Sequence, residues 1–308
     1  MSSKIIVTGG TGFIGRNLCA SLSNSNYEII VLSRNIEIAK KIFGGNATPV
    51  SWDGKSAAGW IDHVDGAHAI INLAGENIGS GRWTQKKKQR ILESRIQAGK
   101  AVVEAIRQTK NKPRVLLQAS GIGIYGDRDD ELLDETSAPG SGFMSDLAQQ
   151  WEQSVQEVAA MGVRLVYLRT GVVLATDADF IQRVMLPFRL FIGGHLGSGK
   201  QWISWIHLDD EVAAIKFLLE NDGLKGVFNL SAPNPLTYKK FFKTLGKVMK
   251  RPSWLHVPGF LLKILLGEMA EGLILSGQRA IPKKLLDAGF GFNHPELENA
   301  LKDILNES

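Results

Sequence analysis

The sequence predicts an α/β protein built on a doubly wound parallel sheet, with a smaller, mainly helical C-terminal domain. Three observations support this fold class. The chain opens on a short apolar strand that leads into a glycine-rich turn, and strand and helix patterns alternate through its first half. After Gly171 the pattern changes to glycine-containing loops and then to helices punctuated by prolines. Alternating strands and helices are typical of a parallel sheet covered by helices.

The predicted strands are short and apolar, as parallel strands that are buried on both faces are. They are Ile5–Val7, Ile29–Leu32, Ala69–Leu73, Val115–Ala119, Leu165–Leu168 and a strand returning to the sheet edge, Val227–Leu230. Apolar residues at helical spacing predict helices at 12–22, 85–106 and 145–160. The stretch from 190 to 199 reads as a loop.

The turn after the first strand predicts a dinucleotide-binding site. Gly9, Gly12 and Gly15 are spaced three apart between the strand and the first helix. In such units the first glycine permits the tight turn, the second lets a pyrophosphate approach, and the third lets the helix pack on the strand. The phosphates then bind at the helix N-terminus. An ordinary tight turn is the alternative. The expected contacts in the turn are Gly9, Thr11, Gly12, Phe13, Ile14 and Gly15.

The end of the second strand favours NADP(H) over NAD(H). Enzymes that use NAD place a carboxylate here for the ribose 2′-hydroxyl. This strand instead ends in Ser33-Arg34, without an acid. Arg34 can bind a 2′-phosphate through a charge-assisted, bidentate contact, and a surface arginine is the alternative. Asp53 either contacts the adenine edge or forms a turn.

Further cofactor contacts are expected after the strand that begins at Ala69. Its end is followed by the small residues Leu73, Ala74 and Gly75, which let the backbone approach a ribose. Arg95, on the next helix, either faces the phosphates or lies on the surface. We assign residues 1–175 and 208–232 to the dinucleotide-binding domain, and residues 176–207 and 233–308 to the smaller, substrate-side domain.

The amino-acid composition indicates which kinds of partner and cellular compartment fit this protein. The 308 residues are 44% hydrophobic and 22% charged, with a net charge of +5 that is too mild and dispersed to favour nucleic acid. Cys19 is the only cysteine, which excludes an intrachain disulfide and favours a reducing compartment. The apolar stretch Phe260–Leu275 contains three charged residues and predicts an amphipathic core helix rather than a membrane span. With no leader sequence apparent, we expect a cytoplasmic protein without membrane partners.

These segments together resemble the extended short-chain dehydrogenase/reductase superfamily. Residues 8–15 match its Thr-Gly-x-x-Gly-x-x-Gly turn, and residues 72–75 match its Asn-x-Ala-Gly segment. More narrowly, the chain resembles uncharacterised NADP-binding "epimerase family" proteins that end in a C-terminal domain of unknown function. This narrower resemblance rests on residues 72–78, 82–83, 94–95, 186–190, 205–207 and 278–282. It implies a Rossmann-type fold, a small-molecule substrate that stays unknown, and a homodimer.

The sequence departs from that superfamily at its proton-transfer groups. The superfamily uses a Tyr-x-x-x-Lys pair and an upstream Ser or Thr, with the lysine lowering the tyrosine pKa. Counting from the Tyr125-Gly126 landmark, the upstream position holds Gly121, and Ser120 lies one place off. The matching pair positions hold Phe143 and Leu147. In this register all three standard groups are missing.

Tyr125 and Ser120 are therefore the candidate catalytic residues. Tyr125 is otherwise a packed aromatic, and Ser120 a strand-end hydroxyl. Glu76 and Asn77 follow a turn expected to contact the cofactor and are further candidates. Arg82-Trp83 either binds an anionic or ring-bearing substrate or is an exposed helix-start pair.

His207 lies in a segment that resembles the superfamily's positioning segment before a helix. There Asp209 or Asp210 is expected to cap the helix. The spacing of His, Cys and Asp residues along the chain predicts no metal site.

Two functions fit these observations. The first is an NADP-dependent oxidoreductase or nucleotide-sugar-epimerase-like enzyme with atypical catalytic residues. The second is a non-catalytic NADP(H)-binding redox sensor or regulatory protein.

Overall fold

The computed structural model describes residues 3–25 and 27–306. Its strands are β1 (Lys4–Thr8), β2 (Glu28–Ser33), β3 (Thr48–Ser51), β4 (Ala69–Asn72), β5 (Val115–Gly121), β6 (Leu132–Leu133), β7 (Arg164–Thr170), β8 (Val172–Leu174), β9 (Gly194–Leu196), β10 (Trp202–Ile203), β11 (Trp205–His207), β12 (Gly226–Leu230), β13 (Leu236–Thr237), β14 (Leu255–Val257) and β15 (Arg279–Ala280). Its helices, with short 3-10 or π turns written η, are α1 (Phe13–Ser23), α2 (Ile36–Phe43), α3 (Ile61–Val64), α4 (Gln85–Gln108), η1 (Ile122–Tyr125), α5 (Phe143–Gln153), η2 (Gln156–Met161), α6 (Asp179–Arg189), α7 (Leu208–Glu220), α8 (Tyr238–Val248), α9 (Gly259–Leu266), α10 (Glu268–Ala270), η3 (Glu271–Leu275), α11 (Lys283–Asp287) and α12 (Leu297–Ile304).

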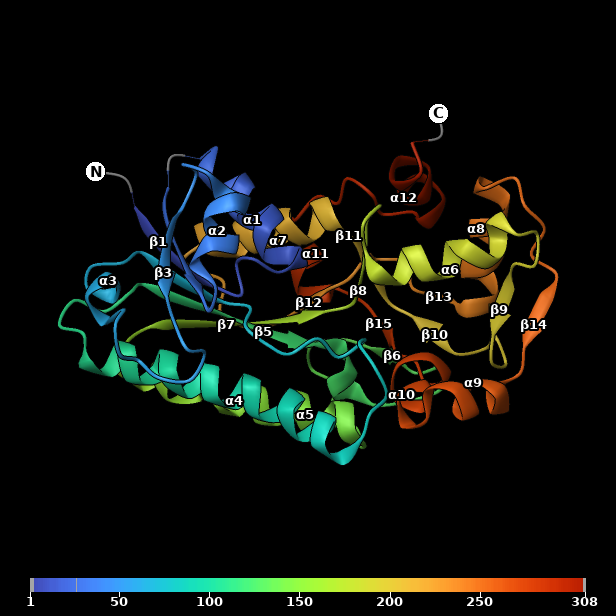
Figure 1. Ribbon diagram of the computed structural model, residues 1–308, viewed down its shortest axis with the longest axis horizontal. Helices are drawn as coiled ribbons and strands as arrows, with labels where there is room; N and C mark the ends of the chain where they lie inside the picture. The colour runs from blue at the N-terminus through green and yellow to red at the C-terminus, as the bar shows by residue number, and fades with distance from the viewer. Residues whose placement is uncertain (1–2, 26, 307–308) are drawn as a thin grey trace.

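The main sheet confirms the predicted fold class. Seven strands pair in the order β12-β7-β5-β4-β1-β2-β3, and every pairing is parallel (Figure 1). All six predicted strands lie in this sheet, and β12 forms its edge as expected. The strand order reverses between β1 and β4, and the crevice beyond such a switch point is where open α/β sheets bind ligands.

The two faces of the sheet are covered by different helices. Ile5 and Val7 of β1 pack into a core shared with α1 and α7, whereas Ile6, between them, packs with α4. This alternation follows from the period of two along a strand. In Figure 1, α1 and α7 lie above the sheet, and α4 and α5 lie below it.

The C-terminal part of the chain packs at the carboxyl end of the sheet. β15 pairs with β6, which follows β5, and the Asn229 amide of β12 donates to the Ile281 carbonyl at 2.9 Å. Helices α8 and α9 and strand β14 lie to the right of the sheet in Figure 1, whereas α11 packs against β12. Part of the segment predicted as a loop is β9, which pairs in parallel with β14.

Two helix predictions need correction. The stretch Phe260–Leu275 is not one core helix: α9 ends at Leu266, before Gly267 with φ of +63°, and α10 and η3 follow. Most apolar side chains of α9 face outward, with Phe260, Ile264 and Leu265 each more than 60% exposed. The helix predicted at 145–160 is α5 followed by the 3-10 turn η2. None of the helices in the described part of the chain is long and apolar enough to cross a membrane.

Candidate cofactor site

Backbone atoms lie so close to Gly9 and Gly15, at the two ends of the Gly9–Gly15 turn, that a side chain does not fit at either position. Gly9 has φ of +65°, and a Cβ on it would lie 2.7 Å from the Leu73 carbonyl group after β4. A Cβ on Gly15 would lie 2.4 Å from the Gly9 carbonyl oxygen. Gly9 therefore lets the turn pass the end of β4, and Gly15 lets α1 begin against β1, as the glycine spacing predicted.

The N-terminus of α1 has no side-chain cap. Its N-cap residue is Gly12, and no acidic residue lies in its first turn. By contrast, Asn35 caps α2 and Thr84 caps α4 through their side chains. The first backbone N–H groups of α1 are therefore available to an anion, and the helix dipole favours one.

A buried polar ladder fixes the loop after β4 beside this turn. The Thr8 hydroxyl donates to the Asn72 amide oxygen and accepts from the Ala74 N–H at 3.2 Å. The Asn72 amide in turn donates to Gln118 of β5 at 2.7 Å. All three side chains are fully buried. The ladder holds the predicted contacts Leu73, Ala74 and Gly75 against the glycine turn.

The end of β2 offers an exposed cation, Arg34. The Ser33 hydroxyl accepts from the Asn35 N–H at 3.1 Å and donates to the Asn35 carbonyl at 3.0 Å, so its local bonds are satisfied. Arg34 is exposed, and among residues 3–25 and 27–306 it has no hydrogen-bond or ion-pair partner. Asp53 forms a turn, accepting from Lys55 N and Ser56 N, which lowers the pKa of its carboxyl.

Arg95 lies beneath the loop after β4 and is not on the surface. Its Nη1 donates to the Glu76 carbonyl at 3.0 Å, and its guanidinium stacks over Trp151 at 4.7 Å. A Cβ on Gly75 would lie 2.8 Å from its Cζ. Burial lowers the pKa of Arg95 to about 10, and its Nε has no partner in the described part of the structure. A buried cation with an unused donor fits a place beside an anionic ligand.

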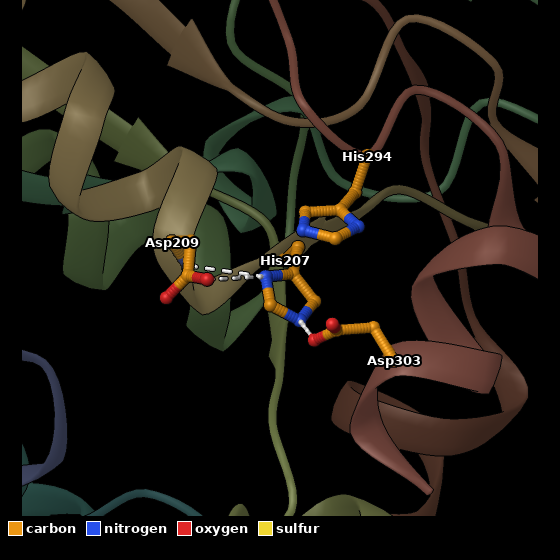
Figure 2. A group of neighbouring side chains, drawn as sticks. All are labelled: His207, Asp209, His294 and Asp303. Atoms are coloured by element: carbon orange, nitrogen blue, oxygen red, sulfur yellow. Dashed lines mark hydrogen bonds and ion pairs between the residues drawn. The ribbon is translucent and has the colours of Figure 1, made fainter. Parts of the chain in front are cut away.

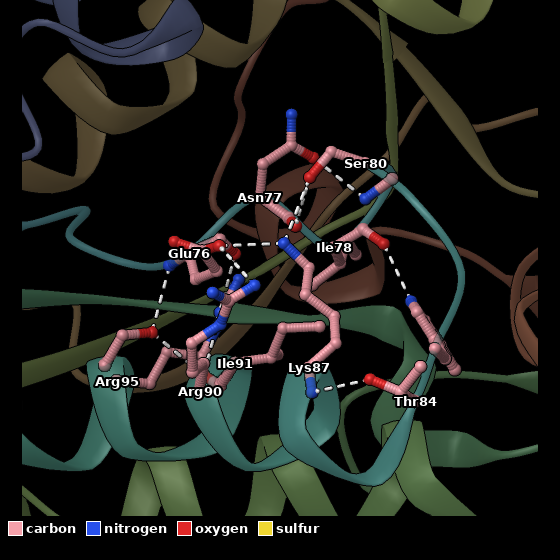
Figure 3. A network of polar contacts seen from close by, with 12 residues as sticks. Glu76, Asn77, Ile78, Ser80, Thr84, Lys87, Arg90, Ile91 and Arg95 are labelled. Atoms are coloured by element: carbon pink, nitrogen blue, oxygen red, sulfur yellow. Dashed lines mark hydrogen bonds and ion pairs between the residues drawn. The ribbon is translucent and has the colours of Figure 1, made fainter.

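A second polar group holds the loop that follows Gly75 (Figure 3). The carboxylate of Glu76 pairs with Lys87 Nζ of α4 at 2.8 Å, and Lys87 also donates to the Ser80 hydroxyl at 3.1 Å. The hydrogen bond from Lys87 lowers the pKa of Glu76, and the charges of Arg90 and Arg34 act in the same direction. Asn77 accepts from the Gly79 N–H. Glu76 and Asn77 thus serve the loop's own structure.

Both candidate catalytic residues belong to a buried network below the sheet's carboxyl end. Ser120 donates to Glu152 at 2.7 Å, and Glu152 forms a two-point ion pair with Arg169 at 2.8 and 2.9 Å. Tyr125 is fully buried, donates to Asn229 at 2.7 Å and accepts from Arg169 at 3.1 Å. Burial raises the pKa of Tyr125, although Arg169 opposes this shift. These contacts fit the packed role that was the alternative for Tyr125, and its catalytic role stays a prediction.

Apolar packing fills the positions where the superfamily places its tyrosine and lysine. Phe143 meets Trp83 edge-to-face at 5.0 Å, and Leu147 lies in the same cluster with Ile91 and Met269. Helix α5 carries no tyrosine, lysine or histidine anywhere along its length. The missing proton-transfer pair is therefore independent of the register chosen along this helix.

Two expectations about flanking residues are corrected by the structure. Trp83 is buried rather than exposed, and Arg82 donates to the Ile264 carbonyl of α9 at 2.6 Å. Neither aspartate caps α7: the cap is His207, whose Nδ1 accepts from the Asp209 N–H at 3.2 Å. Asp210 instead accepts from two backbone N–H groups of residues 293 and 294.

Sequence reasoning missed Lys87, Glu152 and Arg169. Lys87 lies in a basic run that reads as a solvated face, yet it is only 8% exposed. Glu152 and Arg169 come from α5 and β7, and nothing in their spacing marks them as partners. A charged residue inside an otherwise apolar strand such as β7 is the one available signal, because a charge is buried only when it is paired.

The turn at a switch point, the uncapped helix and the end of β2 define a dinucleotide-binding protein of the short-chain dehydrogenase/reductase type. The chain belongs to the NAD dependent epimerase/dehydratase family, which it matches over residues 5–231. Residues 257–304 match a domain of unknown function, DUF1731. The protein is thus an NAD(P)-binding member of this family.

Similar proteins support this assignment along the whole chain. "Epimerase family protein YfhF" of Bacillus subtilis is 42% identical over 305 residues, covering 98% of both chains. A chloroplastic SDR39U1 homolog of Arabidopsis thaliana is 39% identical, covering 98% of this chain and 86% of its own. The crystal structure of human epimerase family protein SDR39U1 with NADPH has a TM-score of 0.89 and 31% identity, covering 99% of this chain and 100% of that chain.

Proposed function

We propose that this protein binds NADP(H) in preference to NAD(H), at the Gly9–Gly15 turn. The observation that carries the proposal is the end of β2, where a free, exposed Arg34 stands and no carboxylate does. The uncapped α1 and the buried Arg95 with an unused Nε fit a cofactor phosphate, and the similar human protein was solved with NADPH. The bound nicotinamide would supply hydride transfer, and the residues named here would bind and orient it.

Replacing Arg34 by alanine is expected to weaken NADPH binding about 10–100-fold, since a hydrogen bond to a charged group contributes about 1.5–3 kcal/mol. NADH lacks the 2′-phosphate, so its affinity should stay the same. Titration of both cofactors, followed by fluorescence or calorimetry, measures the change. Lys41→Ala, an exposed basic residue on the adjoining helix α2, is the matched control. Equal losses for the two cofactors would contradict the proposal.

We further propose that the protein acts as an atypical oxidoreductase or epimerase-like enzyme on a small-molecule substrate. Its proton donor would then be a group other than the usual tyrosine and lysine. A non-catalytic redox sensor is the second candidate, and the apolar cluster around Phe143 and Leu147 favours it. A substrate screen that follows NADPH absorbance separates the two, because only the enzyme consumes the cofactor. The cytoplasmic location and the homodimer stay predictions.

Tyr125→Phe is expected to lower the free energy of unfolding by about 1–3 kcal/mol, because Asn229 and Arg169 each lose a buried partner. NADPH affinity should be unchanged, and so should any turnover found in the screen. Urea denaturation and cofactor titration make the two measurements. Ser120→Ala serves as the parallel variant, since its hydroxyl bonds to Glu152 in the same network. Loss of turnover without loss of stability would instead restore Tyr125 as an acid–base group.

A further inference from the structure

Four side chains from three separate segments meet beside the N-terminus of α7 (Figure 2). They are His207, Asp209, His294 and Asp303, called here the His–Asp cluster. One nitrogen or carboxylate oxygen from each lies within 4.8 Å of those of the others. None of these four residues belongs to the glycine turn or to the network around Glu152, so the proposed function does not use them.

His207 is the fixed centre of this cluster. It is only 4% exposed, and its Nδ1 accepts from the Asp209 N–H at 3.2 Å. Its Nε2 faces the Asp303 carboxylate of α12 at 3.3 Å. The His294 ring lies over it with 3.9 Å between ring centroids. Two imidazoles and two carboxylates thus converge. With neutral rings the two carboxylates give the cluster a net negative charge, which attracts a cation.

Surrounding contacts hold the contributing segments in place. The Asp210 carboxylate is fully buried and accepts from Asn293 N at 2.8 Å and His294 N at 2.9 Å. The end of α12 is anchored where the Thr176 hydroxyl donates to the Ile304 carbonyl at 2.8 Å. Such outer contacts are what orient the ligands of metal sites in proteins.

We propose that His207, His294 and Asp303 bind a divalent transition-metal ion, of which zinc fits best. Zinc takes imidazole and carboxylate ligands at about 2.0–2.2 Å, and tetrahedral geometry then separates two ligand atoms by about 3.4 Å. His207 Nε2 and the Asp303 oxygen already have this separation. The ion would replace the proton between them, and the His294 ring would turn from its stacked position so that a ring nitrogen points to the ion. The three protein ligands would leave a fourth position for water.

Asp209 is assigned a positioning role in this site. With the metal on Nε2, the remaining proton of His207 moves to Nδ1, so the hydrogen bond from the Asp209 N–H is given up and Nδ1 can donate to the Asp209 carboxylate, 3.8 Å away in this structure. A carboxylate that accepts from a metal-bound histidine is a common arrangement, and its loss costs about 10–100-fold in metal affinity. The ion would join β11 and α7 to the C-terminal segment. The spacing along the chain predicted no such site because His207 lies 87 residues before His294.

The test uses the full chain without a histidine tag, stripped with a chelator and titrated with zinc chloride in a calorimeter. We expect one zinc per chain and a rise of about 5 °C in unfolding temperature at saturating zinc. His294→Ala and Asp303→Asn should each weaken zinc binding at least 10-fold, and Asp209→Asn about 10–100-fold. Asp303 is exposed, so its variant is expected to fold.

His256→Ala is the matched control, because His256 stacks on His195 in a second histidine pair without a carboxylate partner in the described structure. It should bind zinc as the unchanged protein does. NADPH titration of every variant verifies that the fold is intact. The proposal would be overturned if the unchanged protein bound no stoichiometric zinc. It would also be overturned if His294→Ala and Asp303→Asn bound zinc as tightly as the unchanged protein. An equal loss in the control would also overturn it.

Discussion

Gly15→Ala is expected to weaken NADPH binding about 100-fold and to destabilise the protein by about 3 kcal/mol. The new Cβ would lie 2.4 Å from the Gly9 carbonyl oxygen and 2.7 Å from Gly10 Cα, so two backbone segments have to separate. Overpacking of this kind costs about 1–3 kcal/mol, and 100-fold in affinity corresponds to about 2.7 kcal/mol. Cofactor titration and urea denaturation measure the two effects.

Gly45→Ala is the control for this substitution. Gly45 is exposed after α2, and a Cβ on it would have no neighbour within 4 Å. It should leave both NADPH affinity and stability within about 0.5 kcal/mol, as surface substitutions usually do. If Gly15→Ala bound NADPH as tightly as the control variant, the close contact between α1 and the turn would not be what the cofactor site requires.

The sheet could be predicted from the sequence because its signals are local. Apolar runs such as Ile5–Val7 have the length and composition of buried parallel strands, and the glycine turn fixes where the first helix begins. The seven-stranded parallel sheet confirms these predictions, with β3 added beside β2. The helices of the C-terminal part are harder to predict from the sequence. The apolar content of Phe260–Leu275 does not show which of its side chains pack against the rest of the protein. There, Gly267 breaks the helix and α9 stays exposed.

The residues of the candidate cofactor site likewise fall into those predictable from local sequence and those that depend on tertiary packing. The turn, the loop at Leu73–Gly75 and the end of β2 are each contiguous in sequence, and the structure brings them to the carboxyl ends of three neighbouring strands, β1, β4 and β2. Arg95 could be proposed, yet its burial and its contact with the Glu76 carbonyl depend on how α4 packs. Lys87 and the cap of α7 depend on tertiary contacts as well. Pairings across dozens of residues are decided by packing, which residue spacing does not encode.

The buried network around Ser120 is expected to contribute strongly to the free energy of unfolding. Arg169 and Glu152 are only 8% and 13% exposed, and two hydrogen bonds join them. Burial by itself lowers the pKa of Arg169, but the hydrogen bond and the charge of Glu152 raise it above its ordinary value. Arg169 also stacks over the Tyr125 ring at 5.2 Å. One ion pair thus ties α5 and β7 to Ser120 of β5 and to Tyr125 of η1.

Glu152→Ala is expected to lower the free energy of unfolding by about 3–5 kcal/mol, because it leaves the Arg169 guanidinium buried without its counter-charge. Replacing both residues by methionine should recover most of that loss, since no charge then stays unpaired. Urea denaturation of Glu152→Met, Arg169→Met and the double methionine variant, beside the unchanged protein, gives the coupling free energy. Strictly additive losses would mean that the pair is not coupled. Recovery of stability with unchanged NADPH affinity would show that this network supports the sheet's carboxyl end without touching the cofactor.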